Sequence, residues 1–286
     1  MNWTSWLPSS RSRRGGQGQT AEGSGREGDP ASQTCGSFLA GRCAFVSGGL
    51  SGMGLAIATR LAEHGARVAV GSRRAAQGAK SPFMTVPLDV CDGADVARAM
   101  ESVEAELGPV DILINAAGIT AEQGVVGHSD DLWQRVIDTN LTGAFRLTRA
   151  VLPGMIAREW GRIINIGSTA ATVGWADNPA YCASKAGLLG LTRCVALEGA
   201  AHGVACTMIS PTWVETDMLH SDTAEIAARE GRGRSSADLV REIREENPQK
   251  RIIQPGEVAA LAAFLCRDEA LGLTMDNIQI TGGALW

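Results

Sequence analysis

The amino-acid sequence predicts an α/β fold, a single domain that is doubly wound around a parallel sheet of about seven strands. Three observations lead to this prediction. From about residue 41, short apolar runs alternate with helical segments. The runs are continuously apolar, which is typical of strands buried on both faces. The first run ends in a glycine-rich turn that leads directly into a helix.

The elements follow one another in strand-then-helix order, as a parallel sheet requires. The predicted strands are 43–48, 67–72, 83–90, 110–118, 161–168, 203–211 and 276–281. The predicted helices are 54–65, 95–108, one or two helices within 130–159, 180–200 and 256–266. Glycines close two of these helices, at Gly65 and at Gly108.

The first 38 residues differ in composition from the rest of the chain. They are rich in Gly, Ser, Gln and Arg and hold few apolar side chains, so we expect residues 1–38 to be a disordered extension. Arg11, Arg13 and Arg14 precede any acidic residue, which leaves a targeting role open. We assign the folded domain to residues 39–286.

Charge and cysteine usage narrow the range of partners. A net charge of -5 provides no basic footprint for nucleic acid. No apolar run reaches the ~20 residues that span a bilayer, so we expect no membrane segment. The seven cysteines form no Cys-x-x-Cys pair, and with four histidines no metal site is expected. We interpret the cysteines as reduced thiols of a cytoplasmic protein.

The segment "SGGLSGMG" (47–54) lies between the first strand and the first helix. Gly48, Gly52 and Gly54 permit backbone conformations and close approaches that side chains would block. The N–H groups at the start of the following helix favour a bound phosphate. In this strand-turn-helix context the pattern predicts a Rossmann-type dinucleotide site rather than an ordinary tight turn.

The end of the second strand indicates which dinucleotide binds. An NAD site places an acidic residue there to hold the ribose 2′-hydroxyl. Here the strand ends in Ser72, Arg73 and Arg74, and no acid follows before Asp89. Arginine can bind a 2′-phosphate through its planar guanidinium, so we expect NADP rather than NAD.

The segment "AYCASKAG" (180–187) contains the only tyrosine of the chain, Tyr181, four positions before Lys185, one of three lysines. Residues four apart share a helix face. Lowering a phenol pKa from ~10 to about 7 takes roughly 4 kcal/mol. An ammonium ~4 Å away at an effective dielectric of 20 supplies that much. The pair therefore predicts an acid/base group that works near neutral pH.

Six motifs in the same order resemble the short-chain dehydrogenase/reductase family, and the resemblance covers residues 41–286. The motifs are "SGGLSGMG" (47–54), "NAAG" (115–118), Asn140-Leu-Thr-Gly, "INIGS" ending at Ser168, "YCASK" (181–185) and "SPTWVETDM" (210–218).

The resemblance implies a catalytic tetrad of Asn140, Ser168, Tyr181 and Lys185. Tyr181 is then the general acid/base. Lys185 lowers the Tyr181 pKa and binds the nicotinamide ribose. Ser168 orients the substrate carbonyl or hydroxyl, and Asn140 holds a water molecule that links Lys185 to solvent.

The resemblance also implies the cofactor contacts. Asp89 would contact the adenine, Asn115 would support the cofactor side of the sheet, and Thr216 would contact the carboxamide. The full set is Gly48, Ser51, Gly52, Met53, Gly54, Ser72, Arg73, Asp89, Val90, Asn115, Ala116, Gly118, Tyr181, Lys185, Pro211, Val214 and Thr216.

Residues 213–250 correspond to the family's substrate lid, and their length and charge resemble the 3-hydroxybutyrate dehydrogenase branch. Ala170 and Asn178 stand where that branch carries its substrate-gripping histidine and lysine. Val173, Trp175 and Trp213 supply apolar surface instead. We therefore expect a more apolar substrate, or one held by Asn178 or by the lid arginines (Arg229, Arg232, Arg234).

These observations predict an NADP(H)-dependent enzyme that interconverts a small-molecule ketone and a secondary alcohol by hydride transfer. One alternative is a reductase of 3-oxoacyl thioesters (acyl carrier protein or CoA) or a 3-hydroxybutyrate dehydrogenase-like enzyme. A more remote alternative is a non-catalytic dinucleotide-binding scaffold. Helical segments with apolar stripes on more than one side, within 130–158 and 180–200, suggest a homodimer or homotetramer.

Overall fold

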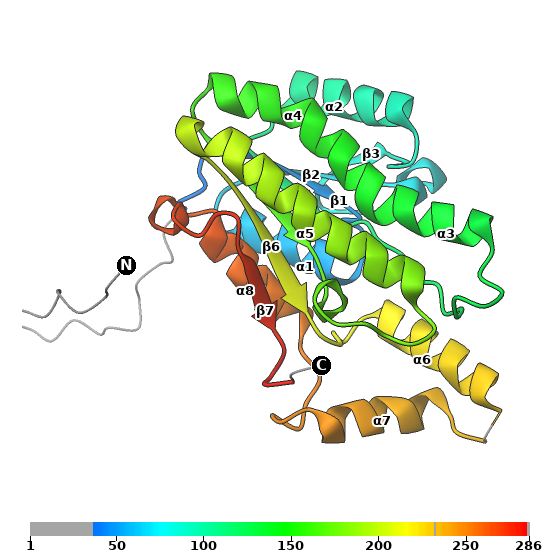
Figure 1. The fold of residues 1–286 in the computed structure, drawn as a ribbon. Coiled ribbons are helices and arrows are strands. Elements are labelled where there is room, and N and C mark those ends of the chain that lie inside the picture. The colour runs from blue at the N-terminus through cyan, green and yellow to red at the C-terminus, as the bar shows by residue number, and fades with distance from the viewer. Residues whose placement is uncertain (1–36, 232, 285–286) are drawn as a thin grey trace, which may run out of the picture. The chain divides into compact units, whose positions relative to one another are not determined.

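The computed structural model describes residues 37–231 and 233–284, and these contain a seven-stranded sheet whose neighbouring strands are all parallel (Figure 1). The strand order is β3-β2-β1-β4-β5-β6-β7. The strands are β1 (Cys43–Ser47), β2 (Arg67–Ser72), β3 (Met84–Pro87), β4 (Ile112–Asn115), β5 (Gly161–Ile166), β6 (Val204–Pro211) and β7 (Asn277–Ile280). The predicted fold class is confirmed.

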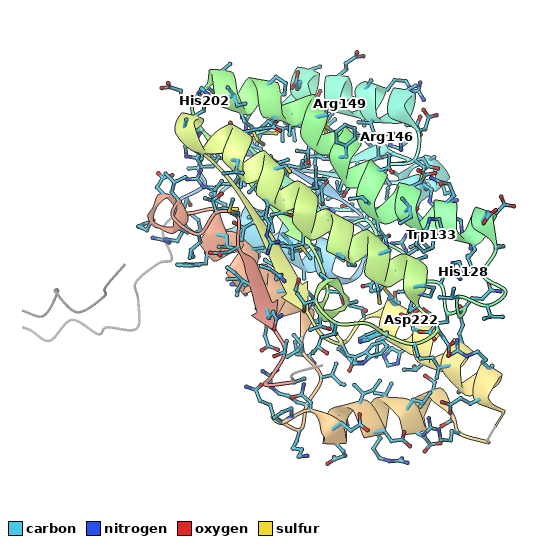
Figure 2. All side chains as sticks on the ribbon, in the orientation of Figure 1. His128, Trp133, Arg146, Arg149, His202 and Asp222 are labelled. Carbon is cyan, nitrogen blue, oxygen red and sulfur yellow. The ribbon has the colours of Figure 1, made fainter. Side chains whose placement is uncertain are left out.

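Helices cover both faces of the sheet and enclose two separate cores (Figures 1 and 2). Alternate residues of β1 face opposite sides: Ala44 and Val46 belong to one core, while Cys43 and Phe45 belong to the other. The first core is closed by α1 (Gly52–Glu63) and α8 (Pro255–Leu265). The second is closed by α2 (Gly93–Leu107), α4 (Gly143–Ala157) and α5 (Pro179–Gly199).

The order of the strands reverses at β1, because the chain adds β2 and β3 on one side and β4 to β7 on the other. Parallel register brings Ser47 at the end of β1 beside Gly71 on β2 and Asn115 on β4. Segments that leave β1 and β4 therefore diverge, and a crevice forms at the carboxyl edge of the sheet, where open α/β sheets bind ligands.

Two segments contain helical structure that the sequence analysis did not specify. Residues 130–157 form α3 (Asp130–Ile137) and α4, joined by a π-helical turn at Asp138–Thr142. The predicted lid region contains α6 (Asp217–Glu230) and α7 (Ser236–Glu246), whose apolar contacts join Leu219 to Val240. Both helices are strongly charged, so periodicity alone did not reveal them.

Phe38, the last residue of the predicted extension, contacts the folded domain. Residues 1–36 of the predicted extension lie outside the described residues, but Ser37 and Phe38 do not. The Phe38 ring centroid lies 4.5 Å from that of His64, and the Arg267 guanidinium lies 4.5 Å from the Phe38 centroid. Phe38 therefore packs against the first core next to α1 and α8.

The turn between β1 and α1 has no space for a side chain at Gly54. An added Cβ would overlap the carbonyl oxygen of Gly48 and lie 2.9 Å from its carbonyl carbon. We expect Gly54→Ala to lower the free energy of unfolding by about 1–3 kcal/mol, as overpacking does. The midpoint of urea unfolding measures this loss.

Gly93 provides a matched control, because it also lies in the first turn of a helix, α2, and a Cβ added there would have no atom within 4 Å. Gly93→Ala is expected to keep or raise stability by up to about 1 kcal/mol. Equal unfolding midpoints for the two variants would contradict the steric account of Gly54.

Candidate active site

Tyr181 and Lys185 lie in the first turns of α5, which begins at Pro179. Their side chains share one face, and the Lys185 Nζ lies 5.5 Å from the centroid of the Tyr181 ring. Lys185 is only 5% exposed, and its Nζ donates a 2.8 Å hydrogen bond to the carbonyl oxygen of Ile166 at the end of β5. This bond anchors the helix face to the carboxyl edge of the sheet.

Ser168 faces Tyr181 from the segment that follows β5. It is buried and caps a short 3₁₀ turn, Thr169–Ala171, by accepting a 3.1 Å hydrogen bond from the Ala170 N–H. The same hydroxyl faces the Tyr181 hydroxyl in one cavity and lowers the pKa of Tyr181. Gly167 permits this close packing, because a Cβ there would lie 2.6 Å from the Ser210 hydroxyl oxygen.

Asn140 lies in the π-helical turn between α3 and α4 and is 2% exposed. Its Oδ1 accepts a 2.9 Å hydrogen bond from the Ile119 N–H, and its Nδ2 donates to the Ile119 carbonyl at 2.9 Å. The Nδ2 also donates to the Ser184 hydroxyl at 3.0 Å. The extra residue of a π turn accounts for this orientation, since such turns redirect a side chain within a helix.

The four predicted catalytic residues therefore converge, but the expected pKa of the tyrosine does not hold. Burial around the hydroxyl raises the Tyr181 pKa to about 12, against the lowering effect of Ser168, and Asp222 raises it further. Burial lowers the Lys185 pKa to about 8. Desolvation of the phenolate outweighs the lysine in this state, because the ammonium is directed at the Ile166 carbonyl.

The predicted cofactor residues surround two adjoining cavities that share Gly48, Ser51 and Gly118. The first is also lined by Ser72, Arg73, Asp89 and Val90. The second is also lined by Gly52, Met53, Gly54, Ala116 and Thr216. Gly48 has φ +69°, and a Cβ on it would lie 3.0 Å from the Ala117 backbone. These glycines keep backbone exposed beside a helix N-terminus, which fits a dinucleotide pyrophosphate.

The adenosine end of this cleft is basic. Arg73 and Arg74 are both exposed and line the cavity beside Asp89. Ser72 caps the 3₁₀ turn that contains them, Arg73–Gln77, by accepting a 3.2 Å hydrogen bond from the Arg74 N–H. The Asp89 carboxylate accepts a hydrogen bond from the Cys91 N–H at 2.9 Å. The residues present fit a 2′-phosphate.

Five predicted cofactor residues do not line these two cavities: Asn115, Tyr181, Lys185, Pro211 and Val214. Asn115 is 4% exposed, and its Nδ2 donates hydrogen bonds to the Thr148 hydroxyl and the Asn165 side-chain oxygen. It therefore joins β4 to α4 and β5 and does not face the cavities. Lys185 lies just below the cleft: a Cβ at Gly118 would be 3.7 Å from its Nζ and 3.4 Å from the Asn140 Oδ1.

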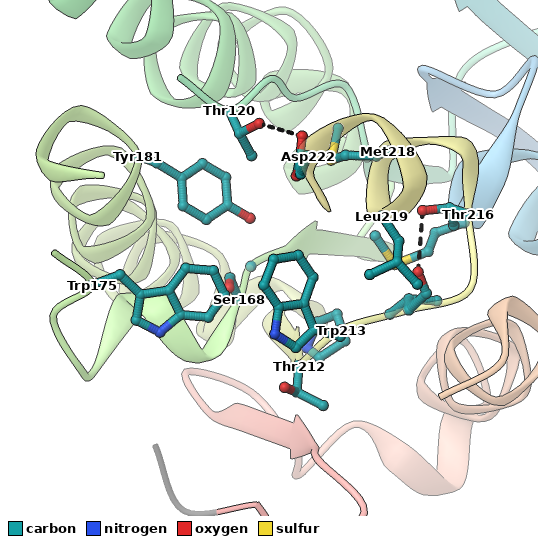
Figure 3. Close-up of a pocket in the computed structure, with 14 residues that line it drawn as sticks. Thr120, Ser168, Trp175, Tyr181, Thr212, Trp213, Thr216, Met218, Leu219 and Asp222 are labelled. Atoms are coloured by element: carbon teal, nitrogen blue, oxygen red, sulfur yellow. Dashed lines mark hydrogen bonds between the residues drawn. The ribbon is translucent and has the colours of Figure 1, made fainter. Parts of the chain in front are cut away.

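A third cavity, next to the cofactor cleft, contains the Tyr181 and Ser168 side chains (Figure 3). Trp175 and Trp213 form one wall, stacked with ring centroids 5.1 Å apart, and the predicted contacts Pro211 and Val214 also line it. Met53, Thr216 and Met218 line both this cavity and the cofactor cleft. The predicted wall residue Val173 and the alternative anchor Asn178 are absent from its lining among the described residues.

Sequence reasoning missed two polar residues of this cavity, Thr120 and Asp222. The Thr120 hydroxyl donates a 2.9 Å hydrogen bond to Asp222 (Figure 3). Neither residue belongs to a motif that the sequence analysis used. Leu219, Asp222 and Thr223 are spaced i, i+3 and i+4 in α6 and therefore share one buried face, which is the signal that was available.

Over residues 37–231 and 233–284, no cluster of three or more His, Cys, Asp or Glu side chains could hold a metal ion.

None of the described helices is both long enough and apolar enough to cross a membrane.

Comparisons with known proteins agree with this geometry. The chain is 36% identical over 250 residues to the 3-oxoacyl-(acyl-carrier-protein) reductase FabG of Salmonella typhimurium, covering 85% of this chain and 97% of that protein. It is 37% identical over 259 residues to the D-beta-hydroxybutyrate dehydrogenase of Cupriavidus necator, covering 87% and 96%. A variant of actinorhodin polyketide ketoreductase, solved with NADPH, superposes with a TM-score of 0.79 at 34% identity, covering 85% and 96%.

The sequence profile described as short chain dehydrogenase matches residues 42–227, which contain the glycine turn and the four converging residues. The chain therefore belongs to the short-chain dehydrogenase family of oxidoreductases, in a region of that family which includes 3-oxoacyl reductases and 3-hydroxybutyrate dehydrogenases.

Proposed function

We propose that this protein is an NADP(H)-dependent oxidoreductase that interconverts a ketone and a secondary alcohol, with Tyr181 as the general acid/base. The observation that carries the proposal is the convergence of Tyr181, Ser168, Lys185 and Asn140 beside the glycine-lined cleft. A non-catalytic scaffold would have no need for a buried, partly desolvated lysine at this position.

In the reductive direction, bound NADPH supplies a hydride to the carbonyl carbon. The Ser168 hydroxyl holds the carbonyl oxygen, and the Tyr181 hydroxyl donates the proton that completes the alcohol. A Tyr181 pKa raised to about 12 keeps that proton in place at neutral pH, which suits an acid. Lys185 then returns a proton to Tyr181, and a water held by Asn140 would carry a proton from solvent to Lys185; both residues lie against Gly118.

NADP is favoured over NAD by Arg73 and Arg74 at the adenosine end of the cleft. The ketoreductase solved with NADPH supports the same cofactor by similarity. For the substrate, the similarity to FabG and to D-beta-hydroxybutyrate dehydrogenase supports a second candidate, a 3-oxoacyl thioester or a 3-hydroxy acid. The apolar Trp175–Trp213 wall instead favours a ketone that carries no carboxylate.

We also propose a homodimer or homotetramer in the cytoplasm. α4 and α5 pack on the sheet with one face, and their outer faces carry Phe145, 42% exposed, and Leu197, 68% exposed. An apolar hollow between these two helices is lined by Leu152 and Leu191. A second copy of the chain would cover this surface.

Tyr181→Phe removes the hydroxyl and keeps the ring. We expect kcat for NADPH-dependent ketone reduction to fall by about 100- to 10,000-fold, the usual contribution of a general acid. The Kd for NADPH, measured by fluorescence titration, should change by less than about threefold because the cleft residues are untouched. Turnover close to that of the wild type would show that another group delivers the proton.

Arg73→Ala removes one guanidinium from the adenosine end of the cleft. We expect the KM for NADPH to rise by about 10- to 100-fold, as for the loss of one charged hydrogen bond, with NADH kinetics nearly unchanged. Arg98→Ala is the matched control, since Arg98 is exposed on α2, pairs with Asp95 and does not line the cleft. A wild-type enzyme that prefers NADH would overturn the assignment.

A further inference from the structure

Asp222 is a buried carboxylate that the proposed reaction does not use. It lies on α6, the first helix of the lid region, and is 7% exposed on the same face as Leu219 and Thr223. Figure 3 shows it directed into the cavity that also receives the Tyr181 hydroxyl from α5. The Thr120 hydroxyl donates a 2.9 Å hydrogen bond to one of its carboxylate oxygens, Oδ1.

No positively charged side chain is available to this carboxylate among the described residues that line the cavity. Arg229, the nearest candidate on α6, is bound elsewhere: it donates to the Glu122 carboxylate at 2.9 Å and to the Glu122 carbonyl oxygen at 3.2 Å. It also lies 3.7 Å from Asp177. The second lid arginine, Arg234, pairs at 2.8 Å with both Glu230 and Glu242.

Among the described residues, the remaining candidate anchor for an anionic substrate, Asn178, is also engaged elsewhere. The Asn178 amide donates to Glu122 at 3.2 Å instead of entering the cavity. Arg232, a third lid arginine, lies outside the described residues. Burial raises the Asp222 pKa to about 6, and Glu122 and Glu225 raise it as well, against the lowering effect of Thr120. Above that pH the carboxylate is mostly ionised.

We propose that Asp222 is a specificity-determining residue that selects ketones whose side group donates a hydrogen bond, through a hydroxyl or an ammonium, and that excludes ketones bearing a carboxylate. This inference rests on the proposed function, because it assigns the substrate class of the same cavity. The four catalytic positions act on the carbonyl, whereas Asp222 acts on the group beside it.

Two physical effects support this selectivity. A carboxylate taken out of water needs a donor or a positive charge, and a hydroxyl or ammonium group of the substrate supplies one. A carboxylate of the substrate would instead meet a second negative charge in a cavity with apolar walls, where repulsion is weakly screened. The stacked Trp175 and Trp213 rings also favour a cation over an anion, because aromatic faces attract positive charge.

The test uses four ketones that share a butan-2-one skeleton: acetoacetate, 4-hydroxybutan-2-one, 4-(dimethylamino)butan-2-one and pentan-2-one. NADPH-dependent kcat/KM is measured for each with the wild type, Asp222→Asn and Glu225→Gln. The asparagine keeps the shape of the side chain and can still accept from Thr120. Glu225 lies one turn further along α6 and is exposed, so Glu225→Gln makes the same change in net charge outside the cavity.

We expect the wild type to use acetoacetate least well. In Asp222→Asn, the ratio of kcat/KM for the hydroxy and amino ketones to that for acetoacetate should fall by about tenfold or more, the usual effect of losing a charged hydrogen bond. The value for pentan-2-one should change by less than about threefold, and Glu225→Gln should keep all ratios. Unchanged ratios in Asp222→Asn, or a wild-type preference for acetoacetate, would overturn the inference.

Calorimetric binding of the same ketones, with and without NADP⁺, separates this inference from the proposed function. If the wild type reduces no ketone, the proposed function fails, and the Kd values then decide about Asp222. Weaker binding of the amino ketone by Asp222→Asn than by the wild type supports the inference. Equal Kd values in the two proteins overturn it.

Discussion

The hydrogen bond from the Lys185 ammonium to the Ile166 carbonyl, 2.8 Å long, joins α5 to the carboxyl end of β5. A buried ammonium is costly unless it is paired, and here its partner is a backbone group whose position the sheet fixes. Together with the packing of Val195 and Ala196 in the second core, that bond fixes the orientation of α5. It thereby holds Tyr181 towards Ser168 and keeps Lys185 against Gly118, at the floor of the cleft.

Close backbone packing at the sheet edge allows cofactor and substrate to meet. Gly48 and Gly54 bring the first turn against the neighbouring backbone, and Gly118 leaves Asn140 and Lys185 facing the cleft. The substrate cavity and the cofactor cleft share Met53, Thr216 and Met218, so a ketone beside Tyr181 lies next to the cofactor site. The lid helix α6 closes this cavity with Asp222, and the mechanism and the selectivity thus depend on different elements.

Much of the fold was predictable because the apolar runs of the strands and the positions of the glycines are local properties of the sequence. The same holds for the Tyr181–Lys185 face, since helical spacing determines it. The direction in which the Tyr181 pKa shifts was not predictable, because it depends on burial by tertiary contacts and on an ammonium directed at Ile166. Asp222 was missed for a related reason: its role arises from tertiary contacts with Thr120 and from arginines engaged by distant acids.

The central claim is that Tyr181 is the proton donor, that burial around its hydroxyl raises its pKa, and that it lies next to the cofactor cleft. Because the chain holds a single tyrosine, ring-labelled ¹³C-tyrosine NMR reports on this residue alone. The account predicts that the Tyr181 resonance titrates above the ordinary phenol pKa of ~10 in the free protein and at lower pH with NADP⁺ bound. A resonance that titrates at the ordinary value and does not respond to NADP⁺ would contradict the account, since Tyr181 would then be solvated and remote from the cofactor.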